Sequence, residues 1–187
     1  GKDGPQEERL GLPTNLTFDK DGTLYVADVG RFQVVKYDRD AHYLGKIGKV
    51  GANLGHFARP RGLAIDRSGT IYAVDASFDN VQMFTPEGQL LMFFGGAGDT
   101  PGTLSLPSNV IIDYENIGYF QEKADPDFEI EHLVIVTSQV GEPLVNVYAF
   151  GRKKNEQYPS EEELREQLQK RVKEWQEEKP EAQEGNA

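Results

Sequence analysis

Apolar and polar residues alternate in short runs over about the first 150 residues of the chain. Residues 23–28, 32–37 and 43–47 are such runs, rich in aromatic and β-branched side chains, and turn-forming residues at 19–22 and 38–40 separate them. Alternation with a period of two is typical of β-strands with one buried face, and short polar turns join such strands in antiparallel order. With a further short strand that ends at Phe18, the pattern predicts a four-stranded antiparallel meander.

The pattern repeats with a period of 47 residues, so that residues of one type recur at fixed positions. Three sets show the period: Gly1, Gly48 and Gly95; Pro13, Pro60 and Pro107; and Asp19, Asp66 and Asp113. A repeat of this length with four short strands per unit is typical of a β-propeller, in which each unit is one blade. We therefore predict an all-β fold of three four-stranded antiparallel propeller blades, at residues 1–47, 48–94 and 95–151.

The segments that join one unit to the next, residues 48–60 and 95–107, each contain several glycines and one large apolar residue. Glycine adopts positive φ without steric cost and so suits a crossing between strands. Phe57 and Leu104 are the apolar residues, and Leu10 occupies the same place in the first unit. We expect these three side chains to fill the space between adjacent blades.

The third unit departs from the pattern. We match Val134 in its second strand with Tyr72 in the second strand of the preceding unit. Val134 follows Tyr72 by 62 residues, 15 more than the period, so this strand starts late. This predicts an insertion at residues 115–131. The insertion contains Tyr119 and Phe120, which make it too apolar for a purely solvated loop, and we expect it to pack on the blade or to contact a partner protein. No fourth strand follows the third, so the last blade is expected to lack its outer strand.

A linker and an amphipathic helix are predicted at residues 152–179. Ser160 and Glu163 have the spacing of a capping box at a helix start. One apolar stripe runs along the predicted helix and consists of Leu164, Leu168, Val172 and Trp175. The stripe suits docking on the rim of the blades or binding another subunit, and both interpretations stay open. The polar tail at residues 180–187 is predicted to be disordered.

Composition excludes several classes of function. The formal net charge is −11, and no concentrated basic face is apparent, so a nucleic-acid partner is not expected. The absence of cysteine excludes disulfides, thiolate metal sites and a thiol nucleophile in this chain. No run approaches the roughly 18 apolar residues of a membrane-spanning helix.

The candidate chemical residues have structural explanations. The three histidines, His42, His56 and His132, lie at no metal-ligand spacing, and surface or turn positions are expected for them. Asp28 and Asp75 recur at matching places, which favours carboxylates that cap the amides of turns. We therefore assign no catalytic, cofactor-binding or metal-binding residue.

The 47-residue units of this chain resemble NHL-type repeats. The NHL unit runs Pro-x-Gly-apolar-Ala-apolar-Asp and then Gly-x-apolar-Tyr-apolar-Ala-Asp. Residues 60–66 read Pro-Arg-Gly-Leu-Ala-Ile-Asp, and residues 22–28 read Gly-Thr-Leu-Tyr-Val-Ala-Asp. The resemblance covers about residues 1–150, in three units. The Asn-His-Arg that usually follows the second strand is replaced by Gly-Arg-Phe at 30–32 and by Phe-Asp-Asn at 78–80.

The resemblance implies a six-bladed β-propeller of a bacterial type, of which three blades make half. A three-blade arc leaves two apolar faces and strand edges bare. We therefore expect the chain to be the C-terminal half of the ring, completed by an N-terminal half present as a separate chain. Pairing of two identical halves is the alternative. Periplasmic or extracellular location, and multihaem cytochromes among the protein partners, are further expectations that come from the resemblance alone.

The favoured function is a non-catalytic scaffold that completes a ring and docks a larger cell-envelope or extracellular assembly. Its expected partner-binding residues are Tyr119, Phe120, Leu164, Leu168, Val172 and Trp175. The alternative is a propeller enzyme of lyase or lactonase type that uses a metal in the central channel and is active only with the other half. A glycan or cell-envelope binder is a third hypothesis.

Overall fold

The computed structural model describes residues 5–159 and the single positions 163, 166 and 170. The chain divides into two compact units, residues 1–152 and 153–187, and the fold considered below is that of the first unit. The predicted helix within 152–179 and the predicted tail at 180–187 lie largely outside the described residues. No helix in the described part is long and apolar enough to cross a membrane.

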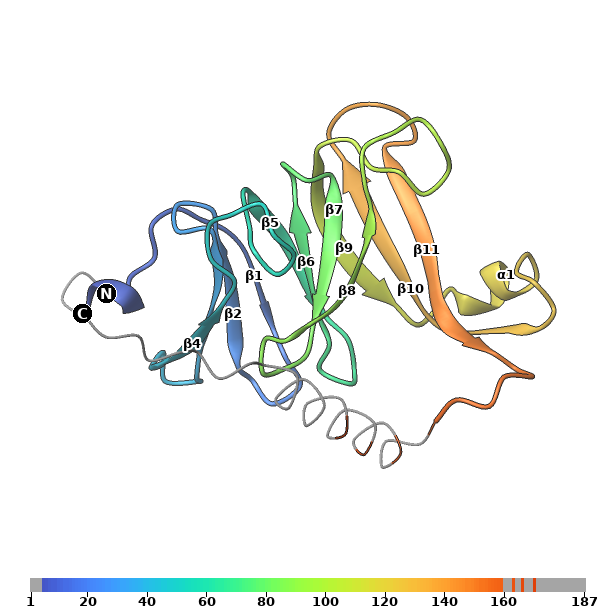
Figure 1. The fold of residues 1–187 in the computed structure, drawn as a ribbon, viewed down its shortest axis with the longest axis horizontal. Helices are drawn as coiled ribbons and strands as arrows, with labels where there is room; N and C mark the ends of the chain where they lie inside the picture. The colour runs from blue at the N-terminus through green and yellow to red at the C-terminus, as the bar shows by residue number, and fades with distance from the viewer. Residues whose placement is uncertain (1–4, 160–162, 164–165, 167–169, 171–187) are drawn as a thin grey trace, which may run out of the picture. The chain divides into compact units, whose positions relative to one another are not determined.

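Three antiparallel sheets follow one another along the chain, which confirms the predicted all-β class (Figure 1). The first sheet holds β1 (Pro13–Phe18), β2 (Leu24–Asp28), β3 (Gln33–Tyr37) and β4 (Tyr43–Ile47). The second holds β5 (Pro60–Ile65), β6 (Ile71–Asp75), β7 (Asn80–Phe84) and β8 (Leu90–Gly95). The third holds β9 (Pro107–Asp113), β10 (Phe128–Ser138) and β11 (Val145–Lys153). Each sheet is a meander with its strands in chain order, so the sheets resemble propeller blades.

The sheets pack through their first strands, because β5 lies between β1 and β9. Gly62 on β5 allows the close approach of β9: a Cβ atom there would lie 2.5 Å from the Cα atom of Asn109. No side chain larger than hydrogen fits at such a distance. The first and third units have Asn15 and Asn109 at this position, so the glycine of the second unit is required by contact between strands of neighbouring sheets.

Two apolar cores lie between the three sheets. The core between the first and second sheets contains Tyr25, Ala27, Val34, Ile47, Phe57, Leu63, Ile71, Ala73 and Phe84. The core between the second and third contains Ala64, Tyr72, Val74, Val81, Met83, Leu104, Val110, Val134 and Val136. Phe57 and Leu104 belong to these cores, as the sequence predicts. Leu10 is exposed and belongs to neither.

The register of the third sheet corrects one prediction. In the second sheet Ile71 pairs with Ile65, and in the third Val134 pairs with Ile112, which lies 47 residues after Ile65. Val134 therefore corresponds to Ile71, 63 residues earlier, and the insertion adds 16 residues rather than 15. Successive side chains of a strand face opposite sides, so this single residue reverses which side chains of β10 face the second sheet.

Buried aspartates fix each connecting segment to the end of a second strand. The carboxylate of Asp28 accepts hydrogen bonds from the amides of Gly11 and Leu12, both at 2.7 Å. Asp75 accepts the amide of Ala58 at 2.7 Å and also binds the turn that follows β6. This confirms that these carboxylates cap backbone amides. In the third sheet a serine at the corresponding place, Ser138, accepts the amide of Ser105 at 3.3 Å.

Replacing Asp75 tests how far the fold depends on this contact. Asp75 is fully buried and accepts the amides of Ala58, Arg59, Ser77 and Phe78. Asp75→Asn keeps the size but replaces one acceptor oxygen with a donor, and we expect the free energy of unfolding to fall by about 2–4 kcal/mol. Urea unfolding measures it. The control is Asp99→Asn at an exposed position, expected to change stability by under about 0.5 kcal/mol. Equal effects of the two substitutions would contradict the structural role of Asp75.

Candidate functional site

Among the described residues, no sheet covers one apolar side of the first sheet, here called the first open face. Its exposed or half-buried residues are Leu10, Leu16, Phe18, Leu24 and Tyr37. Leu16 is 60% exposed, whereas Leu63, its equivalent in the second sheet 47 residues later, is 4% exposed. A hollow of about 490 Å³ lies on this face and includes Leu10, Leu24 and Tyr37 in its lining. Positions that are buried in the second repeat are therefore exposed or only half-buried in the first.

The second sheet shows what covers such a face. Ile71 and Phe84 correspond to Leu24 and Tyr37 and are almost completely buried. Their cover is the opposing side of the first sheet, whose residues in this core are Tyr25, Ala27, Val34 and Ile47. The chain thus contains an example of the surface that fits its own first open face.

The third sheet has a matching bare side, here called the second open face, at Ile111, Ile135, Val145 and Val147. Tyr148 and Phe150 of β11 pack toward the second sheet, so Val145 and Val147 lie on the opposite side of that strand. Ile111 is 50% exposed, whereas the residue 47 positions earlier, Ala64, is 7% exposed. In the described part of the chain, the first and third sheets therefore each have exposed apolar side chains on the side away from the second sheet.

The insertion holds a short helix, α1 (Ile117–Gln121), none of whose residues is buried. Tyr119 is 64% exposed, and its ring lies edge-to-face with Phe120 at 5.1 Å between centroids. Gln121 fixes the segment to the start of β10: its amide donates to the carbonyl of Phe128, and its oxygen accepts the amide of Ile130, each at 2.8 Å. Tyr119 is thus presented to solvent by a helix that is anchored through polar contacts.

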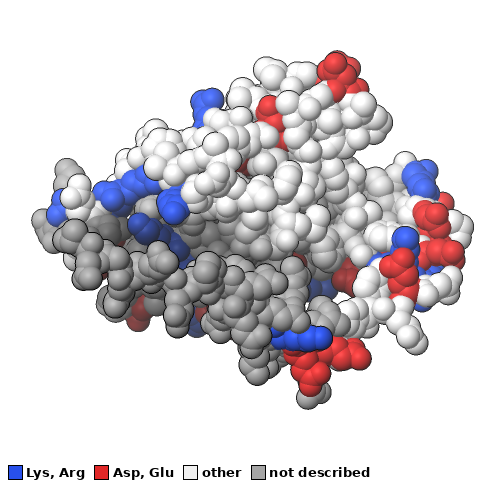
Figure 2. Space-filling view, viewed as in Figure 1, with Lys and Arg blue, Asp and Glu red and all other residues white. Residues whose placement is uncertain are grey.

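Charged side chains of both signs gather at the end of the molecule where α1 lies (Figure 2). Lys123 lies over the ring of Tyr119 at 4.6 Å, and Arg152 pairs with Glu129 at 3.1 Å. The Tyr119 ring is therefore in contact with a positive charge. The other four expected partner-binding residues, Leu164, Leu168, Val172 and Trp175, lie outside the described residues.

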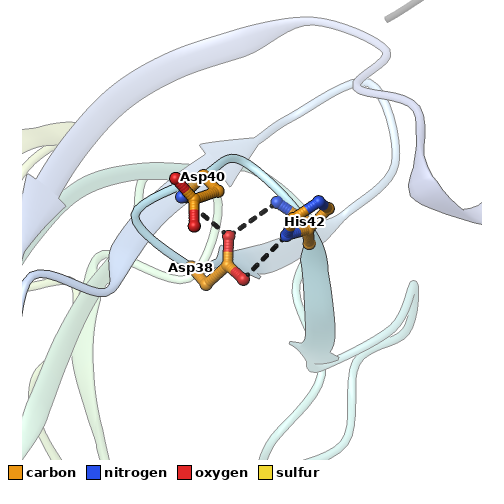
Figure 3. A group of neighbouring side chains, drawn as sticks. All are labelled: Asp38, Asp40 and His42. Atoms are coloured by element: carbon orange, nitrogen blue, oxygen red, sulfur yellow. Dashed lines mark hydrogen bonds and ion pairs between the residues drawn. The ribbon is translucent and has the colours of Figure 1, made fainter.

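Asp38, Asp40 and His42 bring possible metal ligands within 4.8 Å of one another in the turn between β3 and β4 (Figure 3). Oδ1 of Asp38 accepts the amides of Asp40 at 2.9 Å and His42 at 2.8 Å, and Oδ2 lies 3.0 Å from Nδ1 of His42. The hydrogen bond to Asp38 raises the pKa of His42. Since both carboxylate oxygens of Asp38 hold the turn, the cluster is explained as a turn motif, as expected for His42.

His132 contradicts the expectation of a surface or turn histidine. It is 5% exposed and lies within β10, which begins at Phe128, inside the insertion predicted at residues 115–131. Its ring stacks on Phe150 with 4.7 Å between centroids, and Nε2 lies 2.9 Å from the hydroxyl of Tyr72. In the sequence, Phe128, Ile130 and His132 alternate with Glu129 and Glu131, and this alternation marks the earlier start of the strand.

The Tyr72 hydroxyl joins His132 to a carboxylate, since it also lies 3.3 Å from Oδ2 of Asp66. Burial lowers the pKa of His132, and the negative charges of Asp66 and Glu131 oppose this shift. Burial and the nearby Asp66 raise the pKa of Tyr72, so its hydroxyl remains protonated. A cavity of about 200 Å³ adjoins this group, with His132 in its lining.

The buried, neutral His132 predicts a loss of stability in acid. Below about pH 6.5 the unfolded chain binds a proton that the folded state resists, so the free energy of unfolding falls by up to about 1.4 kcal/mol per pH unit. This contribution is complete above that pH and declines as the pH falls toward the lowered pKa of the folded state. His132→Gln removes it, which thermal unfolding at several pH values in carboxylate-free buffers measures.

The control for this experiment is His42→Gln, which removes a contribution of opposite sign. The pKa of His42 is raised, so its stabilisation is present in acid and is lost as the pH rises through that value. Parallel stability curves for the wild type and His132→Gln across acid pH would contradict the assignment of His132 as a buried neutral group.

No protein-family model matches the sequence, and no curated protein matches it. The fold does have counterparts among solved structures, and these neighbours are β-propeller proteins of low identity. A Bacteroides thetaiotaomicron protein of unknown function has a TM-score of 0.53 and 18% identity, and the match covers 73% of this chain and 34% of that one.

Two further neighbours have lower scores. Regucalcin, a calcium-binding protein from Agrobacterium tumefaciens, has a TM-score of 0.46 and 15% identity over 80% of this chain and 49% of its own. The β-propeller domain of Cps50 (Swd1) from Myceliophteria thermophila has a TM-score of 0.43 and 14% identity over 76% of this chain and 40% of its own. The chain spans less than half the length of these proteins, and the likeness concerns the fold alone.

Proposed function

We propose that the chain is a non-catalytic scaffold of the NHL-repeat type, half of a six-bladed β-propeller that completes a ring with an N-terminal half and docks other protein subunits. The observation that carries the proposal is the pair of open faces. Equivalent positions such as Leu16 and Leu63 differ in exposure only because one of them has a neighbouring sheet. A sheet that is apolar on both sides is stable in water when both sides are covered.

The energetic reason for covering the faces is direct. Burial of a large apolar side chain contributes about 1.5–3 kcal/mol relative to its exposed state. Leu16, Phe18, Ile111 and Val145 are each about half exposed or more. A blade seated on either face therefore gains several such contributions at once, which suits an assembly of separate halves.

The repeat also specifies the chemistry of the complementary blade. The first open face should accept residues like those that the first sheet presents to the second, an aromatic residue on a second strand and aliphatic residues on the third and fourth strands. The third sheet has three strands among the described residues, with β11 at its edge. We propose that the N-terminal half supplies the fourth strand there, because an edge strand offers unpaired amides and carbonyls.

Contacts with other subunits are assigned to the insertion and to the C-terminal segment. Exposed aromatic residues such as Tyr119 on an anchored helix suit the centre of a protein interface, and Phe120 lies beside it. The apolar stripe that ends at Trp175 suits the same role. The resemblance to NHL-type propellers supports a periplasmic or extracellular assembly in which multihaem cytochromes are partners.

Sedimentation velocity tests the open faces. The isolated chain should associate as its concentration rises from about 1 to about 100 μM, because bare apolar faces cover one another. Leu16→Asp should weaken this association without unfolding the chain, since Leu16 is already exposed. Leu63→Asp should unfold it, because the equivalent position is buried.

A matched control is Leu54→Asp at an exposed leucine in the connecting segment, which should leave association unchanged. A chain that stays monomeric over this range and unfolds in one cooperative transition would overturn the proposal of an incomplete ring. A stoichiometric metal that is lost from the purified assembly together with an activity would overturn the non-catalytic part.

A further inference from the structure

The cavity beside His132 lies at one end of the second and third sheets, between the turn that joins β5 to β6 and the start of β10. Its volume is about 200 Å³, and its lining consists of Asp66, Arg67, Ser68, Thr70, Tyr114, Glu131, His132 and Phe150. At roughly 30 Å³ per water molecule, this is the volume of six or seven waters. The cavity is thus large enough for a small organic acid.

The carboxylate of Asp66 is already committed to the protein. Oδ1 accepts the amides of Ser68 and Thr70 at 2.9 Å each and the hydroxyl of Ser68 at 2.6 Å. Oδ2 lies 3.3 Å from the hydroxyl of Tyr72. With four hydrogen bonds to its oxygens, Asp66 is a structural group of the turn, and its charge is largely offset by these donors.

The guanidinium of Arg67 is fixed in position by an aromatic ring but has no ionic partner in the described part of the chain. Its Cζ atom lies 3.9 Å from the centroid of the Tyr114 ring, and its amide donates to the Tyr114 hydroxyl at 2.9 Å. The guanidinium makes no ion pair or hydrogen bond with any residue in the described part of the chain. Stacking on an aromatic ring fixes the plane of a guanidinium and leaves the N–H groups at its edge able to bind a carboxylate with two hydrogen bonds.

His132 has one ring nitrogen, Nδ1, without a hydrogen-bond partner among the described residues. A carboxylate only accepts hydrogen bonds, so Tyr72 donates to Asp66, and Nε2 of His132 then donates to the Tyr72 oxygen. This arrangement leaves the lone pair on Nδ1. That atom forms no hydrogen bond with the described residues, although the side chain is 5% exposed and lines the cavity.

We propose that this cavity binds a small carboxylate together with one proton. The carboxylate oxygens accept hydrogen bonds from the guanidinium of Arg67, while Nδ1 of His132 takes a proton from solvent and donates it in a hydrogen bond to the same carboxylate. No bond of the ligand forms or breaks. Because one negative and one positive charge enter together, the net charge of the cavity stays constant, although Asp66 and Glu131 already face it.

The uptake of a proton sets the pH dependence. The free protein holds His132 neutral at neutral pH, with Asp66 and Glu131 as the acidic groups that favour its protonation. A bound carboxylate adds a further negative charge and raises the pKa of the ring. Affinity should therefore increase as the pH falls from about 7.5 to about 6, by up to about tenfold per unit.

Nuclear magnetic resonance of the His132 ring, with acetate and succinate as separate probes, tests the proposal on the whole chain. Saturable shifts of the His132 ring signals that strengthen at lower pH are expected. Arg67→Gln should weaken binding at least about tenfold, whereas Arg39→Gln, which removes an exposed arginine of the first sheet, should leave it unchanged. His132→Gln, followed by calorimetry, should abolish the pH dependence.

The proposal is overturned if neither acid shifts the His132 signals in a saturable way. It is also overturned if binding survives Arg67→Gln at full affinity, or if the affinity is independent of pH. None of these results bears on the open faces, because the lining of the cavity includes no residue of either face.

Discussion

The structure depends on the burial of sheet faces against neighbouring sheets. The second sheet is covered on both sides by the first and third, and as a result every residue of β6 and β7 is buried. Within the described residues, the first and third sheets each pack against another sheet on one side only. The centre of the unit is thus well packed, while its stability at either end depends on what covers the open faces. This asymmetry explains why identical repeat positions have such different environments.

Polar contacts then fix the segment that leads into each sheet from the sheet before it. The buried carboxylates of Asp28 and Asp75 bind amides of the segment that precedes their own sheet, so they fix the connection and not only the local turn. A hydroxyl at Ser138 serves the corresponding place in the third sheet. The amide of Leu106, which corresponds to Arg59, is bound instead by Oδ1 of Asp79 at 2.6 Å. The third connection is thus held by a hydroxyl from its own sheet and a carboxylate from the sheet before it.

The repeat made most of the fold predictable from the sequence, because a fixed period transfers every assignment from one unit to the next. The register of β10 was not predictable in this way. Residues 133–136 read Leu-Val-Ile-Val, an unbroken apolar run without alternation, and such a run does not reveal which side chains face which way. The same apolar run predicts a strand that starts at Leu133, which leaves His132 outside it, whereas β10 starts at Phe128. Local alternation can place His132 on a strand, but it does not reveal the contacts with Tyr72 and Phe150, which come from distant parts of the chain.

The comparison of repeats also separates structure from candidate chemistry. Tyr25 lies 3.4 Å from Asp19 in the first sheet, as Tyr72 lies 3.3 Å from Asp66 in the second, so this contact belongs to the repeat and serves the fold. Only Tyr72 meets a histidine, among the described residues. That histidine arrives on the longer β10 strand, which the insertion allows, and Tyr114 comes from the segment just before it. The features that break the repeat converge on one cavity, and a group that folding alone does not require is where selection for binding has room to act.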